Sequence, residues 1–242
     1  MRVLILAAGL GNRLLPLTAD RPKALVPVGG RPLLARLLTA CAAAGLGEAV
    51  VVTGYRRDVL DRWLAETPQP MPVRTVFNEA YETINNAHSV LVAKDALAGA
   101  DFLKLDGDLL MTPEILRRLA AAPISALCLD ASAAIDDEAM KARVEGGTVT
   151  ALGKWLPVAE ASGESIGAEK IAAADAPALF SAIEEVVHGE GRHEAYYEDV
   201  YYRLIGRGWR LGAVDVSGLR WCEIDDQADL SRAGELARRL DS

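Results

Sequence analysis

The chain has 242 residues, of which 51% are hydrophobic, and its formal net charge is −8 with an isoelectric point near 5.0. This length and apolar content suit one α/β domain with a sizeable core, so we interpret residues 1–242 as a single domain. The acidic balance argues against nucleic acid or an anionic membrane surface as the main partner.

Apolar runs of strand length alternate with segments of helical period through the first half of the chain. Strands are predicted at 3–7, 49–53, 73–77, 102–105 and 125–129. Helices are predicted at 33–44, 58–65, 87–97 and 113–121. This alternation predicts an α/β fold with a doubly wound, mostly parallel, Rossmann-like sheet and helices on both faces. Ligands of such sheets bind beyond the carboxyl ends of the strands.

The second half of the chain has a different pattern. Two predicted strands, 141–145 and 148–152, flank Gly146-Gly147, which is typical of a two-residue hairpin turn. The remaining predicted elements are a strand at 165–171, helices at 177–188 and 194–207, short strands at 211–216 and 219–224, and a helix from Asp226. We therefore expect a small hairpin insertion within the same domain.

The most informative segment follows the first strand. Gly9, Gly11, Arg13 and Lys23 lie within 15 positions of one another. Backbone N–H groups of such a loop, together with two fixed cations, can bind a triphosphate. A dinucleotide-binding G-x-G-x-x-G motif is excluded, because its third glycine position holds Leu14 and prolines follow.

Two acidic pairs are candidates for a metal site. Asp106 and Asp108 directly follow the predicted strand 102–105. Glu223 and Asp225 are two residues apart in a strand-like segment, so their side chains would point to the same face. Carboxylate oxygens at strand ends suit Mg²⁺. The alternative for Asp106 and Asp108 is an ordinary polar turn.

Leu6-Ala7-Ala8-Gly9-Leu10-Gly11-Asn12-Arg13-Leu14, Pro16-Leu17-Thr18 and the segment from Arg21-Pro22-Lys23 to Val28 resemble the signature of the sugar-phosphate-type nucleotidyltransferases. These enzymes join a nucleoside triphosphate to a phosphorylated small molecule and release pyrophosphate. The resemblance extends over nearly the full chain. It implies that Arg13 and Lys23 are catalytic, and that the nucleotide is bound by Leu6, Ala7, Ala8, Gly9, Gly11, Asn12, Arg13, Lys23, Asn86 and Asp106.

The same resemblance narrows the class of acceptor substrate. Members that use hexose 1-phosphates carry a glycine-rich turn near 82–87, whereas this chain has Asn85-Asn86 there, as in the branch resembling choline-phosphate and 2-aminoethylphosphonate cytidylyltransferases. The implied Mg²⁺ ligands are Asp108, Glu223 and Asp225. The implied acceptor-binding residues are Asn85, Lys154, Tyr196, Tyr197, Glu198 and Trp221.

Alternatives remain for these acceptor residues. Lys154 would bind the acceptor's phosphate, with Lys170 as a second possibility or a solvated surface lysine as the plain interpretation. Tyr196 and Glu198 would face the amine, because a cation interacts with aromatic faces and carboxylates. The competing interpretation places the tyrosines in the core of a helix and leaves Glu198 as a solvated charge.

The resulting expectation is a Mg²⁺-dependent cytidylyltransferase that moves CMP from CTP to a small phosphocholine-like phosphate or phosphonate. Alternatives with the same chemistry use 2-aminoethylphosphonate, inositol phosphate or a sugar 1-phosphate, with UTP, dTTP or CTP as the donor. Alternatives of another class are a nucleotide-sugar-using glycosyltransferase and a nucleotide-sensing binding module.

Three well-separated cysteines indicate reduced thiols, and no stretch approaches the ~18 unbroken apolar residues of a membrane span. We expect a cytoplasmic protein whose partners are CTP and a small substrate, without nucleic acid or membrane, and leave a homodimer open.

Overall fold

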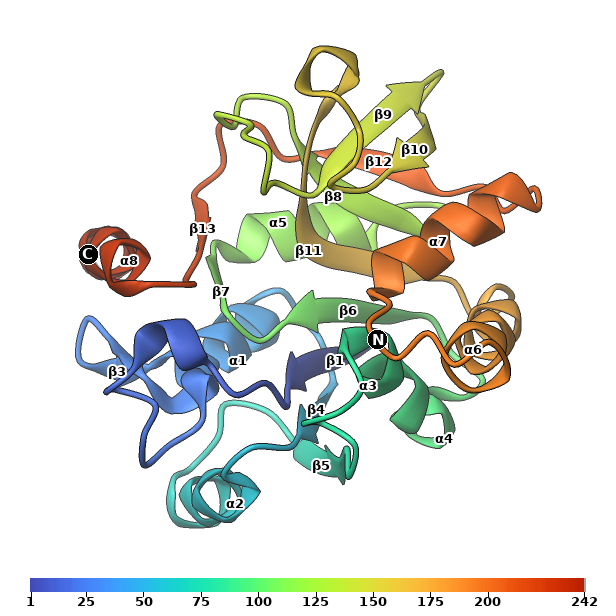
Figure 1. Ribbon diagram of the computed structural model, residues 1–242. Helices are drawn as coiled ribbons and strands as arrows, with labels where there is room; N and C mark the ends of the chain where they lie inside the picture. The colour runs from blue at the N-terminus through green and yellow to red at the C-terminus, as the bar shows by residue number, and fades with distance from the viewer. Residues whose placement is uncertain (242) are drawn as a thin grey trace.

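The computed structural model describes residues 1–241 and contains a nine-stranded mixed sheet with helices on both sides (Figure 1). The strands of this sheet are β1 (Arg2–Ala7), β4 (Glu48–Thr53), β5 (Val73–Phe77), β6 (Phe102–Asp106), β8 (Ala126–Asp130), β9 (Lys141–Glu145), β10 (Thr148–Leu152), β11 (Gly163–Ile171) and β12 (Gly212–Asp215). Their order across the sheet is β5-β4-β1-β6-β11-β8-β12-β10-β9.

Strands β5, β4, β1 and β6 are parallel, as the β-α alternation predicts. Leu6 in β1 is opposite Asp106 in β6, so the glycine loop and the acidic turn leave the sheet at the same edge. The α/β prediction is confirmed, but the sheet is mixed and not mostly parallel. Strand β11 is antiparallel to both β6 and β8, because the chain enters it from the hairpin β9–β10 and not from a crossover helix.

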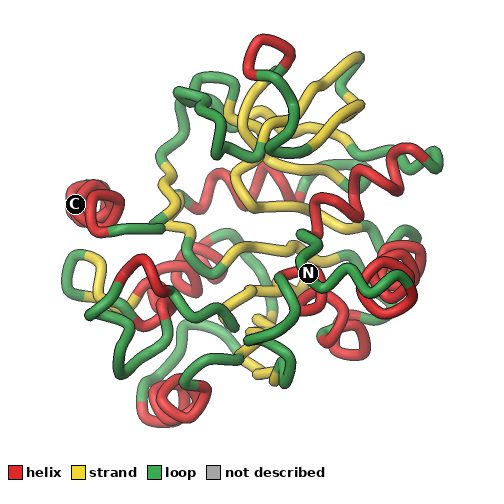
Figure 2. Tube along the Cα trace, in the orientation of Figure 1, coloured by secondary structure: helices red, strands yellow, loops and turns green. Residues whose placement is uncertain are grey.

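Helices cover both faces of the sheet (Figure 2). They are α1 (Leu33–Ala43), α2 (Arg57–Glu66), α3 (Asn86–Val92), α4 (Lys94–Leu97), α5 (Pro113–Ala120), α6 (Ala176–Glu184), α7 (Tyr197–Gly206) and α8 (Gln227–Leu240). Short helical turns are η1 (Asn12–Leu14), η2 (Lys23–Leu25), η3 (Val158–Glu160) and the π-helical η4 (Glu185–Gly189). Because side chains alternate along a strand, Leu4 and Val50 pack with α3, α6 and α7, whereas Val3 and Val51 pack with α1, α2 and α5.

Three predicted helices differ from the observed ones. The predicted helix 177–188 is α-helical only to Glu184, where α6 ends and the π-helical η4 begins. The predicted helix 87–97 is divided into α3 and α4 at Ala93. The predicted helix 194–207 begins later, at Tyr197, because the Asp199 carboxylate accepts a hydrogen bond from the Tyr196 N–H at 3.0 Å and fixes the helix start there. The C-terminal helix has Asp226 as its N-cap, as expected.

A second small sheet was not predicted. It pairs β7 (Leu109–Met111) antiparallel with β13 (Trp221–Glu223), and it joins the turn after β6 to a segment more than 100 positions further along the chain. A third pairing joins β2 (Pro27–Val28) to β3 (Arg31–Pro32). Among residues 1–241, no helix has the length and apolar character needed to cross a bilayer.

Candidate active site

A cavity of about 520 Å³ opens at the carboxyl ends of β1 and β6. Its lining brings together most of the residues predicted from the sequence: Leu6, Ala7, Ala8, Gly9, Gly11, Asn12, Arg13, Lys23, Asn85, Asn86, Asp106, Asp108, Lys154, Tyr196, Glu198, Glu223 and Asp225. Lining residues that were not predicted include Asn78, Tyr81, Ile84, Ser89, Glu138, Ala139, Met140 and Glu164.

The glycine loop is fixed by contacts from its own second half and from Tyr55, which follows β4. Gly11 adopts the left-handed conformation, with φ of 64°, and η1 begins directly after it. The Thr18 hydroxyl donates to the Gly11 carbonyl at 3.0 Å, and the Tyr55 hydroxyl donates to the Thr18 carbonyl at 3.1 Å. Leu14 is fully buried and anchors the loop. The loop therefore holds Arg13 at the edge of the cavity.

The acidic residues form one cluster at the end of β6. Asp108 lies two residues beyond the end of β6, and pairing of β13 with β7 places Glu223 opposite Leu109. The Ile224 N–H donates to the Asp108 carbonyl at 3.1 Å, which fixes this register. Oxygen atoms of Asp108, Glu223 and Asp225 lie within 4.8 Å of one another. The unpredicted strand β7 is therefore what joins the two predicted acidic pairs.

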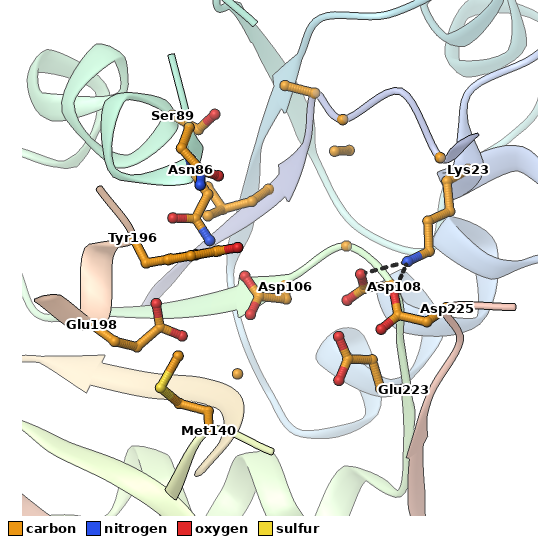
Figure 3. A pocket seen from close by; sticks show the side chains of 18 of the residues that line it. Lys23, Asn86, Ser89, Asp106, Asp108, Met140, Tyr196, Glu198, Glu223 and Asp225 are labelled. Atoms are coloured by element: carbon orange, nitrogen blue, oxygen red, sulfur yellow. Dashed lines mark hydrogen bonds and ion pairs between the residues drawn. The ribbon is translucent and has the colours of Figure 1, made fainter. Parts of the chain in front are cut away.

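Lys23 lies against this cluster (Figure 3). Its Nζ is 2.8 Å from Asp108 Oδ2 and 2.9 Å from Asp225 Oδ1, and Arg13 is 2.9 Å from the same Asp225 oxygen. Burial opposes the charge of Lys23, but the two carboxylates outweigh it and raise the pKa of the lysine. Desolvation by the surrounding protein atoms, followed by the charges of Asp108 and Asp225, raises the pKa of the Glu223 carboxyl to about 8, although part of the side chain is exposed.

The oxygen atoms of the cluster are suitable ligands for a divalent cation. All three residues offer carboxylate oxygens, which Mg²⁺ prefers. Asp108 Oδ1 is buried and has no hydrogen-bond donor among the described residues. Lys23 and Arg13 therefore do not satisfy every oxygen of the cluster, and a cation that takes several oxygen ligands would.

Gly107 is required by the close approach of the acidic turn to β1. A Cβ built on Gly107 would lie 2.2 Å from the Leu6 carbonyl oxygen, well inside contact distance. The absence of a side chain at this position lets the turn pack on β1. Asp106 and Asp108 are thereby held next to the glycine loop.

The opposite side of the cavity is built by the start of α3 and the start of α7. Asn86 Oδ1 accepts a hydrogen bond from the Tyr197 N–H at 3.0 Å, and the Asn85 side-chain amide donates to the Glu194 carbonyl at 3.0 Å. The asparagine pair thus ties the two helices together as well as lining the cavity. At the rim, Lys154 pairs with Glu138 at 3.3 Å.

Two predicted acceptor residues do not line the cavity. Tyr197 is fully buried in the helix core, and its hydroxyl donates to Asp106 Oδ2 at 2.7 Å. The Trp221 indole N–H donates to Asp130 Oδ2 at 2.7 Å, which turns the ring away. Lys170, the alternative to Lys154, also lies elsewhere, because its ammonium donates to the backbone carbonyls of Ala120, at the end of α5, and Ala122.

Sequence reasoning missed a charged group beneath the cavity. Lys104 in β6 is fully buried, and its Nζ lies 2.9 Å from Glu169 in β11 and 3.0 Å from Asp106. The available signal was a single lysine inside the apolar strand 102–105, where burial demands a partner. The partner lies on a strand more than 60 positions away, so the local pattern could not identify it.

Residues 3–195 match the family described as MobA-like NTP transferase domain. The chain is 33% identical over 96% of its length to CMP-5'-(3-aminopropyl)phosphonate synthase of Streptomyces rubellomurinus, and it spans only 38% of that relative's length. It is 27% identical to CTP:phosphoglutamine cytidylyltransferase of Campylobacter jejuni, over 95% of this chain and 98% of that protein. The inositol-1-phosphate CTP transferase from T. maritima has the same fold, with a TM-score of 0.84 at 22% identity over 100% of this chain and 96% of that chain.

Proposed function

Because the chain belongs to the family of MobA-like NTP transferase domains, we propose that it transfers CMP from CTP to the phosphate or phosphonate of a small amine-bearing acceptor. The proposal treats residues 1–242 as one catalytic domain. Two relatives that align with nearly all of this chain are named for CMP or CTP chemistry, which supports CTP as the donor. The observation that carries the proposal is the meeting of Asp108, Glu223 and Asp225 with Lys23 beside the glycine loop.

The proposed reaction is an in-line displacement at the α-phosphorus of CTP. An acceptor oxygen forms the new bond to this phosphorus, the bond from phosphorus to the bridging oxygen of the β-phosphate breaks, and pyrophosphate leaves with the electron pair. The attacking oxygen is already anionic, so neither a general base nor a protein nucleophile is needed. Arg13 and Lys23 would neutralise charge on the triphosphate, and catalysis would rest on positioning and electrostatics.

Asp108, Glu223 and Asp225 would hold Mg²⁺. Among residues 1–241, the carboxylates that line the cavity outnumber the three cationic side chains, Arg13, Lys23 and Lys154. A triphosphate entering such a cavity needs added positive charge, and this neutralisation is what Mg²⁺ supplies when bound. The three carboxylates lie where that charge is needed, at the end of β6 and beside the loop.

The acceptor would lie between this cluster and the starts of α3 and α7. Lys154 at the rim would bind its phosphate or phosphonate, and Tyr196 with Glu198 would bind its amine, next to Asn85. All four residues line the cavity. The cytoplasmic location and the homodimer stay predictions.

The test is pyrophosphate release in the presence of Mg²⁺. CTP, UTP, GTP and ATP would each be combined with phosphocholine, 2-aminoethylphosphonate, 3-aminopropylphosphonate, inositol 1-phosphate and glucose 1-phosphate. We expect release with CTP and an amine-bearing acceptor. Release with UTP and glucose 1-phosphate would contradict both the proposed donor and the proposed acceptor class. Absence of release with every pair would refute the proposed reaction on these substrates.

A further inference from the structure

Three carboxylates share one ammonium beneath the acceptor side of the cavity. Lys104 Nζ contacts Asp106 Oδ1 at 3.0 Å and Glu169 Oε2 at 2.9 Å, and lies 3.3 Å from the centre of the Tyr197 ring. Lys104 and Glu169 are directly opposite each other in the β6–β11 ladder. Glu198, in the first turn of α7, is the third carboxylate, and it is only 6% exposed. The group therefore carries more negative than positive charge when its carboxyls are ionised.

The carboxylates of this group lack hydrogen-bond donors as well as compensating positive charge. Oε1 of Glu169 and Oε2 of Glu198 are enclosed and have no hydrogen-bond donor among the described residues. Burial raises the pKa of Glu169 to about 8 and that of Glu198 to about 7, because Lys104 offsets only part of the desolvation. Buried acceptors without donors are costly, which points to a missing donor that carries positive charge.

Glu198 is the member of this group through which a ligand can supply that donor. Its carboxylate lines the cavity, and Figure 3 shows it directed toward the centre, with Asp106 between it and the cluster around Asp108. Glu169, by contrast, is 1% exposed and does not line the cavity. A cation at Glu198 would thus lie across the cavity from the proposed Mg²⁺ ligands, as the amine end of a short acceptor must.

The aromatic surroundings of Glu198 distinguish two kinds of cation. A quaternary ammonium has no N–H and is bound by several aromatic faces together. Within residues 1–241, the aromatic side chains that line the cavity are Tyr81 and Tyr196. The Tyr197 ring is covered by Lys104, and Trp155 packs on Tyr202 with ring centres 5.0 Å apart. The site offers hydrogen-bond acceptors and lacks an aromatic cage.

We propose that the acceptor carries a primary ammonium group whose N–H groups donate to the Glu198 carboxylate, and that a quaternary ammonium is a poor substitute. This inference rests on the proposed cytidylyl transfer and narrows its substrate class. A charge-assisted hydrogen bond to a carboxylate is stronger than a neutral one, and progressive N-methylation removes the donors one by one while keeping the charge.

The test is a methylation series at constant phosphate and chain length. The acceptors are 2-aminoethyl phosphate, its N-methyl, N,N-dimethyl and N,N,N-trimethyl derivatives, and ethyl phosphate as the form without nitrogen. A second pair, 3-aminopropylphosphonate and its trimethyl derivative, covers a longer spacer. With saturating CTP and Mg²⁺, we expect kcat/KM to fall about tenfold or more from the primary to the trimethyl acceptor, in whichever of the two series the enzyme accepts as substrate. An equal or higher value for the trimethyl compound overturns the inference.

Two variants test whether Glu198 is the source of the selectivity for the primary over the trimethyl acceptor. Glu198→Gln should reduce kcat/KM for the primary amine and leave that for ethyl phosphate nearly unchanged, so that the series becomes flat. Glu194→Gln, an exposed glutamate four positions earlier, is the matched control and should keep the selectivity. An equal loss for every acceptor, ethyl phosphate included, would mean that Glu198 is only structural. Thermal melting checks folding, and the wild-type series stands even if the variant does not fold.

Calorimetric binding of the same acceptors separates this inference from the proposed reaction. Preferred binding of the primary amine without pyrophosphate release would keep the ammonium site and refute cytidylyl transfer to these compounds. Pyrophosphate release with binding that does not depend on N-methylation would keep the transfer and refute the ammonium site. Absence of binding by every amine would refute the site outright.

Discussion

Replacing Lys23 with alanine removes an ammonium that lies 2.8 Å from Asp108 Oδ2 and 2.9 Å from Asp225 Oδ1. At an effective dielectric constant of about 20, each contact corresponds to about 6 kcal/mol of gross Coulomb attraction before desolvation is subtracted. Removing one partner of a buried ion pair lowers the free energy of unfolding by about 3–5 kcal/mol. Because the Lys23 side chain is 17% exposed, we expect a loss at the lower end, about 3 kcal/mol of unfolding free energy.

The same substitution should reduce turnover independently of stability. Loss of one preorganised charge at a transferring phosphoryl group costs about 10²–10³-fold in kcat. Urea denaturation with and without Mg²⁺ and pyrophosphate release at saturating substrates measure the two effects. Mg²⁺ should reduce the stability loss, because it supplies positive charge to the same carboxylates, but it should not restore the rate.

Arg21→Ala is the matched control, since Arg21 is two positions earlier and pairs with Asp20 at the surface. Such exposed pairs contribute about 0–1 kcal/mol, so this variant should remain close to wild type in both assays. A rate for Lys23→Ala within tenfold of wild type would refute the catalytic role of Lys23. A stability loss that Mg²⁺ leaves unchanged would refute the view that the lysine and the ion share Asp108 and Asp225.

Asp108→Asn should abolish the rise in melting temperature on Mg²⁺ titration and lower turnover at least about 10²-fold; an unchanged rise would place the ion elsewhere. Burial raises the pKa of Glu169 from 4.5 to about 8, so the native state holds a proton that the unfolded chain has released, and this residue makes the unliganded protein less stable as pH rises from 4.5 through 8. Glu169→Gln should flatten that decline in urea titrations at several pH values, and equal slopes would contradict it. Gly107→Ala should destabilise by about 4 kcal/mol or more, because its Cβ would lie 2.2 Å from a carbonyl oxygen of β1, whereas Gly234→Ala in α8, with nothing within 4 Å, should be neutral or gain about 0.5–1 kcal/mol. Equal melting temperatures for the two glycine variants would refute the close-approach argument.

Features fixed by local physics were predictable from the sequence. The β-α alternation marked the parallel strands, Gly146-Gly147 marked the hairpin, and both glycines have positive φ, as that turn requires. Asp226 was identified as a helix start, and its carboxylate accepts the Asp229 N–H at 2.9 Å. Each of these features depends on residues within a few positions of one another.

Features that depend on distant partners were not predictable in the same way. Strand β7 has three residues, and only its pairing with β13 makes it a strand. Trp221 and Tyr197 have the residue types of a cation site, but Asp130 and Asp106 bind their polar atoms and draw them away from the cavity. Sequence shows which side chains are available to a ligand and does not show which of them the fold has already used.

Strand β6 explains why the two ends of the cavity belong to one site. Lys104 and Asp106 are two residues apart and share one face of the strand, where they meet Glu169 and the acceptor side. Asp108 follows after Gly107, and β7 holds it on the side of the acidic cluster. A one-residue slip of β6 against β1 would turn Lys104 and Asp106 to the opposite face, into the core around α1 and α5. The buried Lys104–Glu169 pair opposes such a slip, so the charge that shapes the acceptor side also fixes the position of the proposed metal ligands.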